Sequence, residues 1–356
     1  MPARPLHASH RCFLPPLASC ASSYADDDLA MHLRGAHGVF DLYLEGRKQL
    51  LQKAIYSEAE TQMEGRLKAE LARLEAMSEK AAQATRKQAE QVSKALAPPP
   101  YWKAGGSALN QPSLYMKGVC QTLLSETCMV HASHTFPCKP AMNCCSIKTA
   151  TVISCHRIQD DRRWSEYAVK RDNIAREHRA RSHAVATLNP SHSAGDLPLT
   201  MTKLEELKKG LTSTLRMDVN EMYLWHGYDV QHEAAIIGSN LDVRLASDGG
   251  LYGAGLYFAE NSCKSNQYCQ HHGDRGHQDS SKTYALVLCR VVLGDIYHTS
   301  VTCAGLTRPP IKPGHSRGGG TFDSIVACGG TQIHREFIVF ENAQVYPEFT
   351  VHFTYQ

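Results

Sequence analysis

Three short segments of the sequence gather polar side chains and glycines next to apolar runs. The first is Leu224–Gly227, where an apolar run ends at His226 and a glycine. The second, Gly253–Glu260, is rich in glycine and aromatic residues, and the third, His334–Phe340, has one carboxylate, Glu336, near the start of an apolar run. A glycine leaves its backbone open to a ligand, an aromatic face can stack on a cation, and a carboxylate can stabilise developing positive charge.

Taken singly, each segment also has a plain structural explanation. His226 could be a hydrogen-bonded core histidine, Tyr257 and Tyr268 core aromatics, and Glu336 a charge at the edge of a sheet. The second segment continues into a short helix that we expect Asn261 or Ser262 to cap. That helix carries polar side chains, which are Ser262, Lys264, Ser265 and Tyr268.

The elements that must position these segments are mostly strands. Five runs fit a strand by their apolar content or alternation, the last as a half-exposed strand: Thr151–Ser154, Met222–Trp225, Thr283–Leu293, Glu336–Phe340 and Phe349–Tyr355. The glycine-rich stretch Gly314–Gly330 is predicted to be a long loop between strands. Thr202 with Glu205 forms a capping box and predicts the start of a helix. Long-range strand pairing with short helices between predicts an α+β domain.

The N-terminal part has a different composition. Residues 47–97 hold no proline, and Ala, Glu, Lys, Gln, Arg and Leu dominate, which predicts a long helix or coiled-coil arm. Its apolar stripe fades after Leu74, so both a self-association arm and a solvated helix remain open. We expect a disordered tail over 1–46, a linker over 98–112 that begins with three prolines, and a folded domain over 113–356.

Composition excludes several classes of protein. The 356 residues are 42% hydrophobic and contain no apolar run of the roughly 18 residues that a bilayer requires, so we expect no membrane span. A formal net charge of +3 argues against a nucleic-acid partner. The thirteen cysteines, without a secretory signal, predict reduced thiols and an intracellular protein of the cytoplasm or nucleus. The basic, serine-containing N-terminus faintly resembles an organelle transit peptide, but its prolines favour a disordered tail.

The order of these segments and their amino-acid sequences resemble those of the catalytic domain of the poly(ADP-ribose) polymerase family. The run from Gly249 to Tyr268 resembles the tankyrases in particular. Further family-like segments are Arg157–Gln159 with Trp164 and Tyr167, Leu288–Gly294 and Gln344–Phe349. The resemblance covers about 151–356. It implies the ADP-ribosyltransferase fold of two packed, mostly antiparallel sheets, with NAD as substrate in the cleft between them.

The resemblance also implies a role for individual residues. His226, Tyr257 and Glu336 match the family's signature of histidine, tyrosine and glutamate. His226 would hydrogen-bond the adenosine ribose of NAD, and Tyr257 would shape the nicotinamide pocket. The carboxamide of nicotinamide would pair with the backbone of Gly227 and the hydroxyl of Ser265, and Tyr268 would stack on the pyridinium ring.

Glu336 carries the expected chemistry. Cleavage of the nicotinamide–ribose bond builds positive charge on the sugar, which a carboxylate stabilises. The same group could orient an incoming hydroxyl, and this permits a polymer. The sequence therefore predicts an NAD-dependent transferase that attaches ADP-ribose to protein acceptors and could elongate it. The alternatives are strict mono-transfer, a catalytically weak NAD-binding scaffold acting through the N-terminal helix, and transfer to nucleic-acid ends.

No metal site is expected. Tankyrases hold zinc in the loop after the equivalent of Tyr268. In this chain that loop begins with Cys269-Gln270-His271-His272, but no further cysteine occurs before Ser281. A second cluster has ligand types without a familiar structural spacing, namely Cys128, His131, His134 and Cys138. No 33-residue repeat is visible, which argues against ankyrin repeats.

Overall fold

The computed structural model describes ten stretches of the chain: 26–57, 61–102, 109–112, 114–129, 144–180, 197–207, 210–269, 279–313, 320–329 and 332–356. The chain divides into two compact units, one up to Gln91 and one from Val92 to Gln356. Each unit is described by itself.

Two long helices form the described part of the first unit, α1 (Asp26–Ser57) and α2 (Thr61–Leu96), and the last turn of α2 belongs to the second unit. Lys48 of α1 and Glu75 of α2 form an ion pair at 3.5 Å. Every side chain described in the first unit is exposed or half-buried. The pair of helices therefore has no buried core of its own among the described residues.

The structure differs from the expected tail over 1–46 and from a single helix over 47–97. Helix α1 begins at Asp26, inside the stretch predicted as a tail, and α2 begins a second helix at Thr61. The sequence before 47 contains Gly38 and Gly46, which lower helix propensity by about 1 kcal/mol each. The acidic residues at the start of α1 favour a helix there, because they offset the positive end of the helix dipole.

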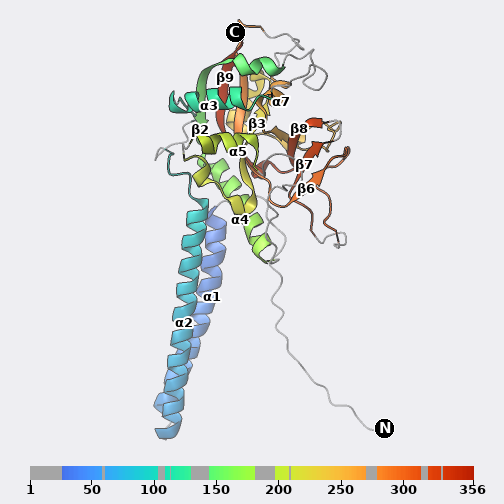
Figure 1. The fold of residues 1–356 in the computed structure, drawn as a ribbon. Coiled ribbons are helices and arrows are strands. Elements are labelled where there is room, and N and C mark those ends of the chain that lie inside the picture. The colour runs from blue at the N-terminus through green and yellow to red at the C-terminus, as the bar shows by residue number, and fades with distance from the viewer. Residues whose placement is uncertain are drawn as a thin grey trace, which may run out of the picture. The chain divides into compact units, whose positions relative to one another are not determined.

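The second unit contains one sheet, whose strand order among the described residues is β1-β2-β9-β5-β3-β4-β8-β7-β6 (Figure 1). Its nine strands are β1 (Leu109–Pro112), β2 (Thr151–Ile158), β3 (Glu221–Gly227), β4 (Leu256–Ala259), β5 (Tyr284–Val292), β6 (Ile296–Thr299), β7 (Ser324–Gly329), β8 (Gln332–Val339) and β9 (Val345–Thr354). Every neighbouring pair is antiparallel except β6 with β7, which is parallel.

The α+β class is as predicted, but the expected two packed sheets are one hydrogen-bonded sheet. Its two parts, β1-β2-β9-β5-β3 and β4-β8-β7-β6, join where β3 meets β4. That junction consists of a single residue pair, Trp225 with Ala259. The short β4 pairs along its full length with β8, so it contacts β3 only at its end. The expectation of two sheets came from the family resemblance, and in the structure the two parts are joined at this one residue pair.

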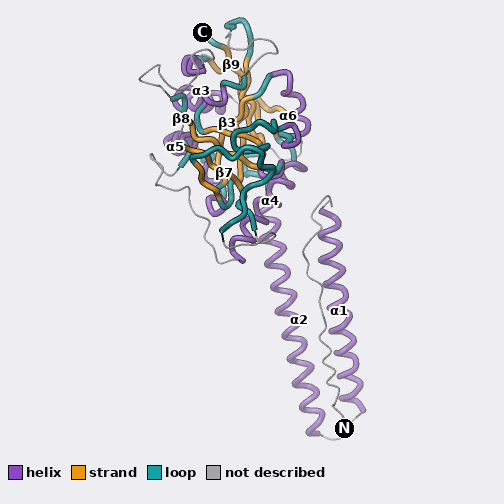
Figure 2. The backbone as a smooth tube through the Cα atoms, turned by 90° about the vertical axis from the view of Figure 1, so that its right-hand side faces the viewer, coloured by secondary structure: helices purple, strands orange, loops and turns teal. Residues whose placement is uncertain are grey.

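Helices surround the strands of the second unit (Figure 2). Its complete α-helices are α3 (Leu114–Glu126), α4 (Asp161–Ala180), α5 (Leu199–Glu206), α6 (Glu233–Ser239) and α7 (Ser262–Asn266). Short 3₁₀ helices are η2 (Cys144–Thr149), η3 (Thr212–Thr214), η4 (Met217–Val219), η5 (Val230–His232), η6 (Val243–Leu245) and η7 (Asn342–Gln344).

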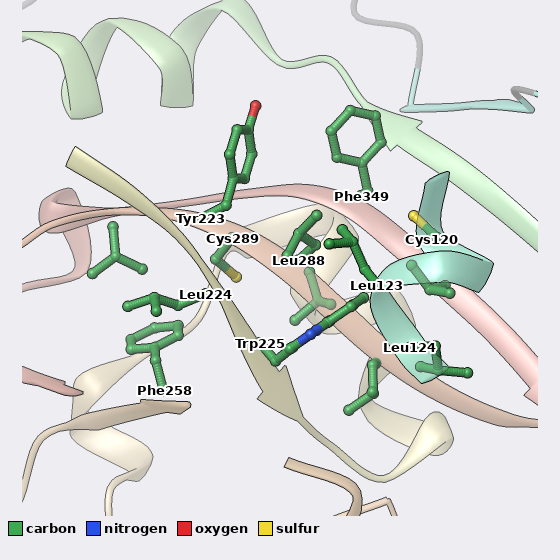
Figure 3. Close-up of a cluster of buried hydrophobic side chains, with 14 of the residues drawn as sticks. Cys120, Leu123, Leu124, Tyr223, Leu224, Trp225, Phe258, Leu288, Cys289 and Phe349 are labelled. Carbon is green, nitrogen blue, oxygen red and sulfur yellow. The ribbon is translucent and has the colours of Figure 1, made fainter. Parts of the chain in front are cut away.

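The main core lies between α3 and the central strands (Figure 3). Leu123 and Leu124 of α3 pack with Trp225 of β3 and Leu288 of β5, and all four side chains are fully buried. The indole nitrogen of Trp225 donates a hydrogen bond to the hydroxyl of Thr127 at 3.1 Å. This core fixes β3 immediately before His226.

All five predicted strands are present, with two differences nearby. β9 is buried almost throughout instead of half-exposed, because it lies inside the sheet between β2 and β5. The stretch Gly314–Gly330, predicted as a loop, contains strand β7. Ser324 and Ile325 pair there with Val339 and Ile338 of β8, the next strand in the chain.

Two further local predictions are wrong. Helix α5 begins at Leu199 after Pro198, so Thr202 and Glu205 lie inside the helix instead of capping it. Part of the predicted linker 98–112 belongs to the folded unit. The Tyr101 hydroxyl donates to buried Glu348 at 2.6 Å, and strand β1 pairs with β2. Within the described residues, no helix is both long and apolar enough to cross a membrane.

Candidate active site

The three polar segments found in the sequence meet across three adjacent strands. Trp225 of β3 pairs with Ala259 of β4, and Ala259 pairs in turn with Glu336 of β8. His226 and Gly227 follow Trp225 directly, and Tyr257 lies two residues before Ala259. The narrow junction of the sheet therefore brings together the segments that hold the predicted signature.

Gly227 marks a very close approach between the end of β3 and helix α7. A Cβ atom at Gly227 would lie 1.9 Å from the backbone oxygen of Ser265 and 3.1 Å from Cβ of Tyr268. Only a glycine fits here without moving the helix. Because of this contact, Gly227, Ser265 and Tyr268 are neighbours.

The side chains of Ser265 and Tyr268 present different surfaces. The Ser265 hydroxyl is buried and donates to the Trp225 carbonyl oxygen at 3.1 Å, which ties α7 to β3. The Tyr268 side chain is 53% exposed, so it can offer a ring face to a planar ligand. Together with the backbone of Gly227, they place a hydroxyl group and an aromatic ring next to a close backbone contact.

His226 is held in one tautomer by the backbone. Its Nδ1 lies 2.8 Å from the carbonyl oxygen of Tyr257. A carbonyl only accepts hydrogen bonds, so Nδ1 carries the proton and Nε2 is left with a lone pair in the neutral ring. Burial lowers the pKa of His226 from 6.5, although the bond to Tyr257 opposes this shift. The ring can therefore accept a hydrogen bond from a hydroxyl at Nε2.

Tyr257 uses its hydroxyl inside the protein. The phenol donates to the carbonyl oxygen of Gly253 at 2.9 Å and accepts from the amide of Tyr252 at 2.8 Å. Burial is the largest cause that raises its pKa to about 12, so the phenol is neutral in the physiological range. These bonds fix the turn before β4 and hold the Tyr257 side chain in one position.

Glu336 faces a lysine. Lys264 Nζ of α7 lies 3.1 Å from Glu336 Oε1, and both side chains are largely buried. Burial by itself lowers the pKa of Lys264, but the Glu336 carboxylate, followed by Tyr268, raises it overall. The ammonium also lies 5.6 Å from the centre of the Tyr268 ring. The Lys264 ammonium therefore lies close to both the Tyr268 ring and the Glu336 carboxylate.

The comparison with known families decides the identity of this arrangement. The poly(ADP-ribose) polymerase catalytic domain matches residues 143–355, which is more than half of the chain. The chain belongs to the poly(ADP-ribose) polymerase family. The match spans β2 through β9 and includes every site residue described above.

Curated relatives in the family match shorter regions. Protein mono-ADP-ribosyltransferase PARP12 from Homo sapiens is 31% identical over 137 residues, which cover 38% of this chain and 17% of the relative. Protein mono-ADP-ribosyltransferase PARP11 from Mus musculus is 31% identical over 148 residues, covering 38% and 43%. Poly [ADP-ribose] polymerase 1 from rice (Oryza sativa subsp. japonica) is 27% identical over 150 residues, covering 35% and 15%. The matched regions span less than half the length of each relative.

These relatives support the poly(ADP-ribose) polymerase family but not the finer resemblance to tankyrases. PARP12 and PARP11 carry mono-ADP-ribosyltransferase names, and neither is a tankyrase. Three glycines of the run from 249 to 268 are required by packing, because a Cβ atom at Gly250, Gly253 or Gly255 would lie within 2.5 Å of another atom. The sequence of this run is therefore a weak guide to subgroup.

The poly(ADP-ribose) polymerase domain uses NAD as its substrate. The described residues fit a nicotinamide: the Gly227 backbone lies against α7 with the Ser265 hydroxyl on that helix, the Tyr268 ring is exposed, and Glu336 lies near it with Lys264. Sequence reasoning placed Lys264 on this helix without giving it a role. Its position directly before Ser265 was the available signal.

Metal ligands are not assembled in the part of the family domain that the structure describes. Among those residues, no three histidine, cysteine or acidic side chains lie close enough to hold a metal ion. Of the two clusters considered from the sequence, Cys128 and Cys269 are described, and neither forms a disulfide. His131, His134, Cys138 and 270–272 lie outside the described residues.

Proposed function

We propose that this chain is an NAD-dependent protein ADP-ribosyltransferase. It would break the bond between nicotinamide and ribose and transfer ADP-ribose to a side chain of a protein acceptor. The observation that carries this proposal is the Glu336–Lys264 pair at 3.1 Å, next to the close contact of Gly227 with Ser265 and Tyr268. Family membership supports the same reaction.

Each residue has a role in binding NAD. The backbone N–H and C=O of Gly227 pair with the carboxamide, and Tyr268 stacks on the pyridinium ring. Ser265 Oγ now donates to Trp225, and it donates to the carboxamide oxygen when its hydroxyl turns. His226 Nε2 accepts a hydrogen bond from an adenosine ribose hydroxyl, because its Nδ1 proton is engaged by Tyr257.

Glu336 supplies the electrostatic part of the reaction. As the ribose C1′–N bond breaks, its electron pair goes to the pyridinium nitrogen and neutral nicotinamide leaves. Positive charge develops on the ribose, and a carboxylate stabilises this charge more than it stabilises bound NAD. The acceptor atom then forms a bond to C1′, and its proton passes to Glu336 or to water. Lys264 holds the Glu336 carboxylate in place before NAD binds.

We infer mono-ADP-ribosyl transfer as the finer activity. PARP12 and PARP11, to which the chain is similar, are named as mono-ADP-ribosyltransferases. Glu336 is compatible with elongation, so the polymer predicted from the sequence stays as an outcome of the assay.

The deciding experiment incubates the purified chain with labelled NAD and measures both nicotinamide release and labelled protein. We expect a discrete labelled band from the wild type, and a ladder would contradict mono-transfer. Glu336→Gln is expected to retain NAD binding and to lose transfer, whereas His226→Ala is expected to weaken NAD binding. A wild type that binds NAD but releases no nicotinamide would overturn the enzyme assignment and favour the scaffold. Unchanged transfer by Glu336→Gln would overturn the mechanism.

We also propose that α1 and α2 mediate self-association. Large apolar side chains on these helices are exposed, namely Val39, Leu42, Tyr43, Leu50 and Met77. Acidic and basic residues alternate on both helices, so a second copy presents complementary charges. A second copy would bury the apolar side chains, for which the described part of this unit has no core.

The test compares the mass in solution of the full chain with that of Tyr43→Lys/Leu50→Lys. We expect the wild type to sediment as a dimer or larger and the double variant to sediment as a monomer. A monomeric wild type at micromolar concentration would refute self-association.

We infer an intracellular location in the cytoplasm or nucleus. NAD as substrate supports this location, and so do the described cysteines, because they form no disulfide. Immunofluorescence of the tagged full chain would test it, and an organellar signal would contradict it.

A further inference from the structure

Side chains continue the pairing of β4 and β8 beyond the point where the strand β4 ends. The last backbone pair of these strands is Ala259 with Glu336. The next residues on each side are Glu260 and Arg335, whose side chains form two hydrogen bonds: Arg335 Nε donates to Glu260 Oε1 at 2.8 Å, and Arg335 Nη2 donates to Glu260 Oε2 at 2.7 Å. Such a two-pronged contact fixes both distance and orientation.

A second side-chain contact follows this ion pair. His334 Nδ1 lies 3.1 Å from Asn261 Oδ1, and the Asn261 amide donates to the Thr127 carbonyl oxygen at 3.1 Å. Ser262, the first residue of α7, is held by Thr127 as well, because its amide donates to the Thr127 hydroxyl at 3.2 Å. The start of α7 is therefore attached to both β8 and the end of α3.

The Glu260–Arg335 pair is well placed to be rigid. Each side chain is 13% exposed. Glu260 Oε2 also accepts from the Leu199 amide at 2.6 Å, and Arg335 Nη2 donates to the Leu197 carbonyl oxygen at 3.3 Å. The guanidinium lies 5.3 Å from the centre of the Phe337 ring. These additional partners hold the ion pair against the segment before α5.

The position of this pair relative to Glu336 gives it a consequence for the reaction. Neighbouring side chains of a strand point to opposite faces, so Arg335 lies on the face opposite Glu336 and touches no part of the proposed NAD site. Glu336 occupies the terminal backbone pair of β4 with β8, and strand ends open most easily. Lys264 lies only four residues after Glu260. A contact between Glu260 and Arg335 therefore constrains both members of the Glu336–Lys264 pair.

We propose that Glu260 and Arg335 are a positioning pair that keeps the Glu336 carboxylate and the Lys264 ammonium in register for catalysis. This inference rests on the proposed ADP-ribosyltransferase function. It assigns no catalytic contact to Arg335 or Glu260. It predicts that their loss lowers turnover while NAD binding persists, because Gly227 and Ser265 remain tied through β3.

The experiment is a double-mutant cycle in the full chain with Glu260→Gln, Arg335→Gln and both together. Nicotinamide release gives kcat and KM for NAD at a temperature well below the Tm of every variant. We expect each single variant to lower kcat roughly 10- to 100-fold, as misplacement of a reacting group does, with KM within about twofold of the wild type. The double variant should lose no more than the larger single loss, because both changes break one contact.

Conservative and control variants separate positioning from stability. Arg335→Lys keeps the charge without the two-pronged contact and should recover part of kcat. Asp160→Asn removes another partly buried ion pair, with Arg163 at 2.9 Å on α4, and should lower Tm without changing kcat.

The outcomes distinguish the two proposals. A wild type that releases no nicotinamide refutes the proposed function itself. An active wild type whose Glu260 and Arg335 variants lose Tm but keep kcat refutes the positioning role alone, as does full additivity in the cycle. A rise in KM with kcat unchanged would also overturn it, since that would place the pair in NAD binding.

Discussion

The contact at Gly227 makes a quantitative test of the site. In Gly227→Ala, the new Cβ atom would lie 1.9 Å from the backbone oxygen of Ser265, whereas ordinary contact begins at 3.4 Å. The end of β3 and helix α7 must therefore separate by about 1.5 Å, which is 3.4 Å minus 1.9 Å. The nearest atoms belong to the backbone, so no side-chain rotation relieves the clash.

This displacement acts directly on the proposed nicotinamide site. Gly227 and Ser265 lie on its two sides, and a shift of about 1 Å in a reacting geometry lowers rates on the order of 100-fold. We expect Gly227→Ala to lower kcat/KM for NAD by at least roughly 100-fold and to weaken NAD binding by calorimetry. Overpacking of this kind also destabilises by about 1–3 kcal/mol, which a thermal melt would detect.

Gly118→Ala is the matched control. Gly118 lies in α3, and no heavy atom lies within 4 Å of the place its Cβ would occupy. Alanine there favours the helix by up to about 1 kcal/mol, so Tm should rise slightly and NAD kinetics should not change. If Gly227→Ala bound and cleaved NAD as the wild type does, the proposal that nicotinamide binds at Gly227 and Ser265 would be wrong.

Three further outcomes are expected. Lys264→Met should lower kcat by about 10- to 100-fold, since Glu336 loses the ammonium group 3.1 Å from its Oε1 that holds the carboxylate in place; a rate equal to the wild type would exclude a role for this lysine. Thr127→Val should lower the free energy of unfolding by about 1–3 kcal/mol in denaturant titration, because Trp225 Nε1 and the Ser262 amide both lose their acceptor. Burial lowers the pKa of His226 from 6.5, so the unfolded chain takes up a proton that the folded chain excludes; the stability this group contributes is complete above pH 6.5 and is lost as the pH falls below it. His226→Gln should therefore lose less Tm than the wild type between about pH 7.5 and pH 5.5, and equal losses would contradict this.

Local patterns in the sequence were sufficient for the strands nearest to the proposed chemistry. The apolar runs at 222–225, 283–293 and 336–340 correspond to β3, β5 and β8, because a strand buried on both faces requires continuous apolar residues. The six predicted site residues lie on β3, β4, α7 and β8 or at their ends, and segments far apart in the chain are neighbours. Their roles toward NAD remain predictions.

Features that depend on distant partners were not predictable in the same way. Strand β7 lies in a glycine-rich stretch and exists through its pairing with β6 and β8. Helix α1 was predicted as a tail, because glycines in that stretch lower its helix propensity. The stretch around Tyr101 was predicted as a linker, although the Tyr101 hydroxyl donates a hydrogen bond to Glu348. The partner of Tyr101 lies 247 residues away in the sequence, where composition carries no information about it.

The sequence by itself determined which residue types are available: a histidine and a glycine at the end of one strand, a hydroxyl and an aromatic ring on one short helix, and a carboxylate on an apolar strand. The tertiary structure decided their relations. Only the packed fold places Ser265 so close to Gly227 that no side chain fits, pairs Lys264 with Glu336, and extends β4 and β8 through Glu260 and Arg335. The physical reason is that distances between side chains on different strands follow from sheet register and helix packing, and these are set by the whole core.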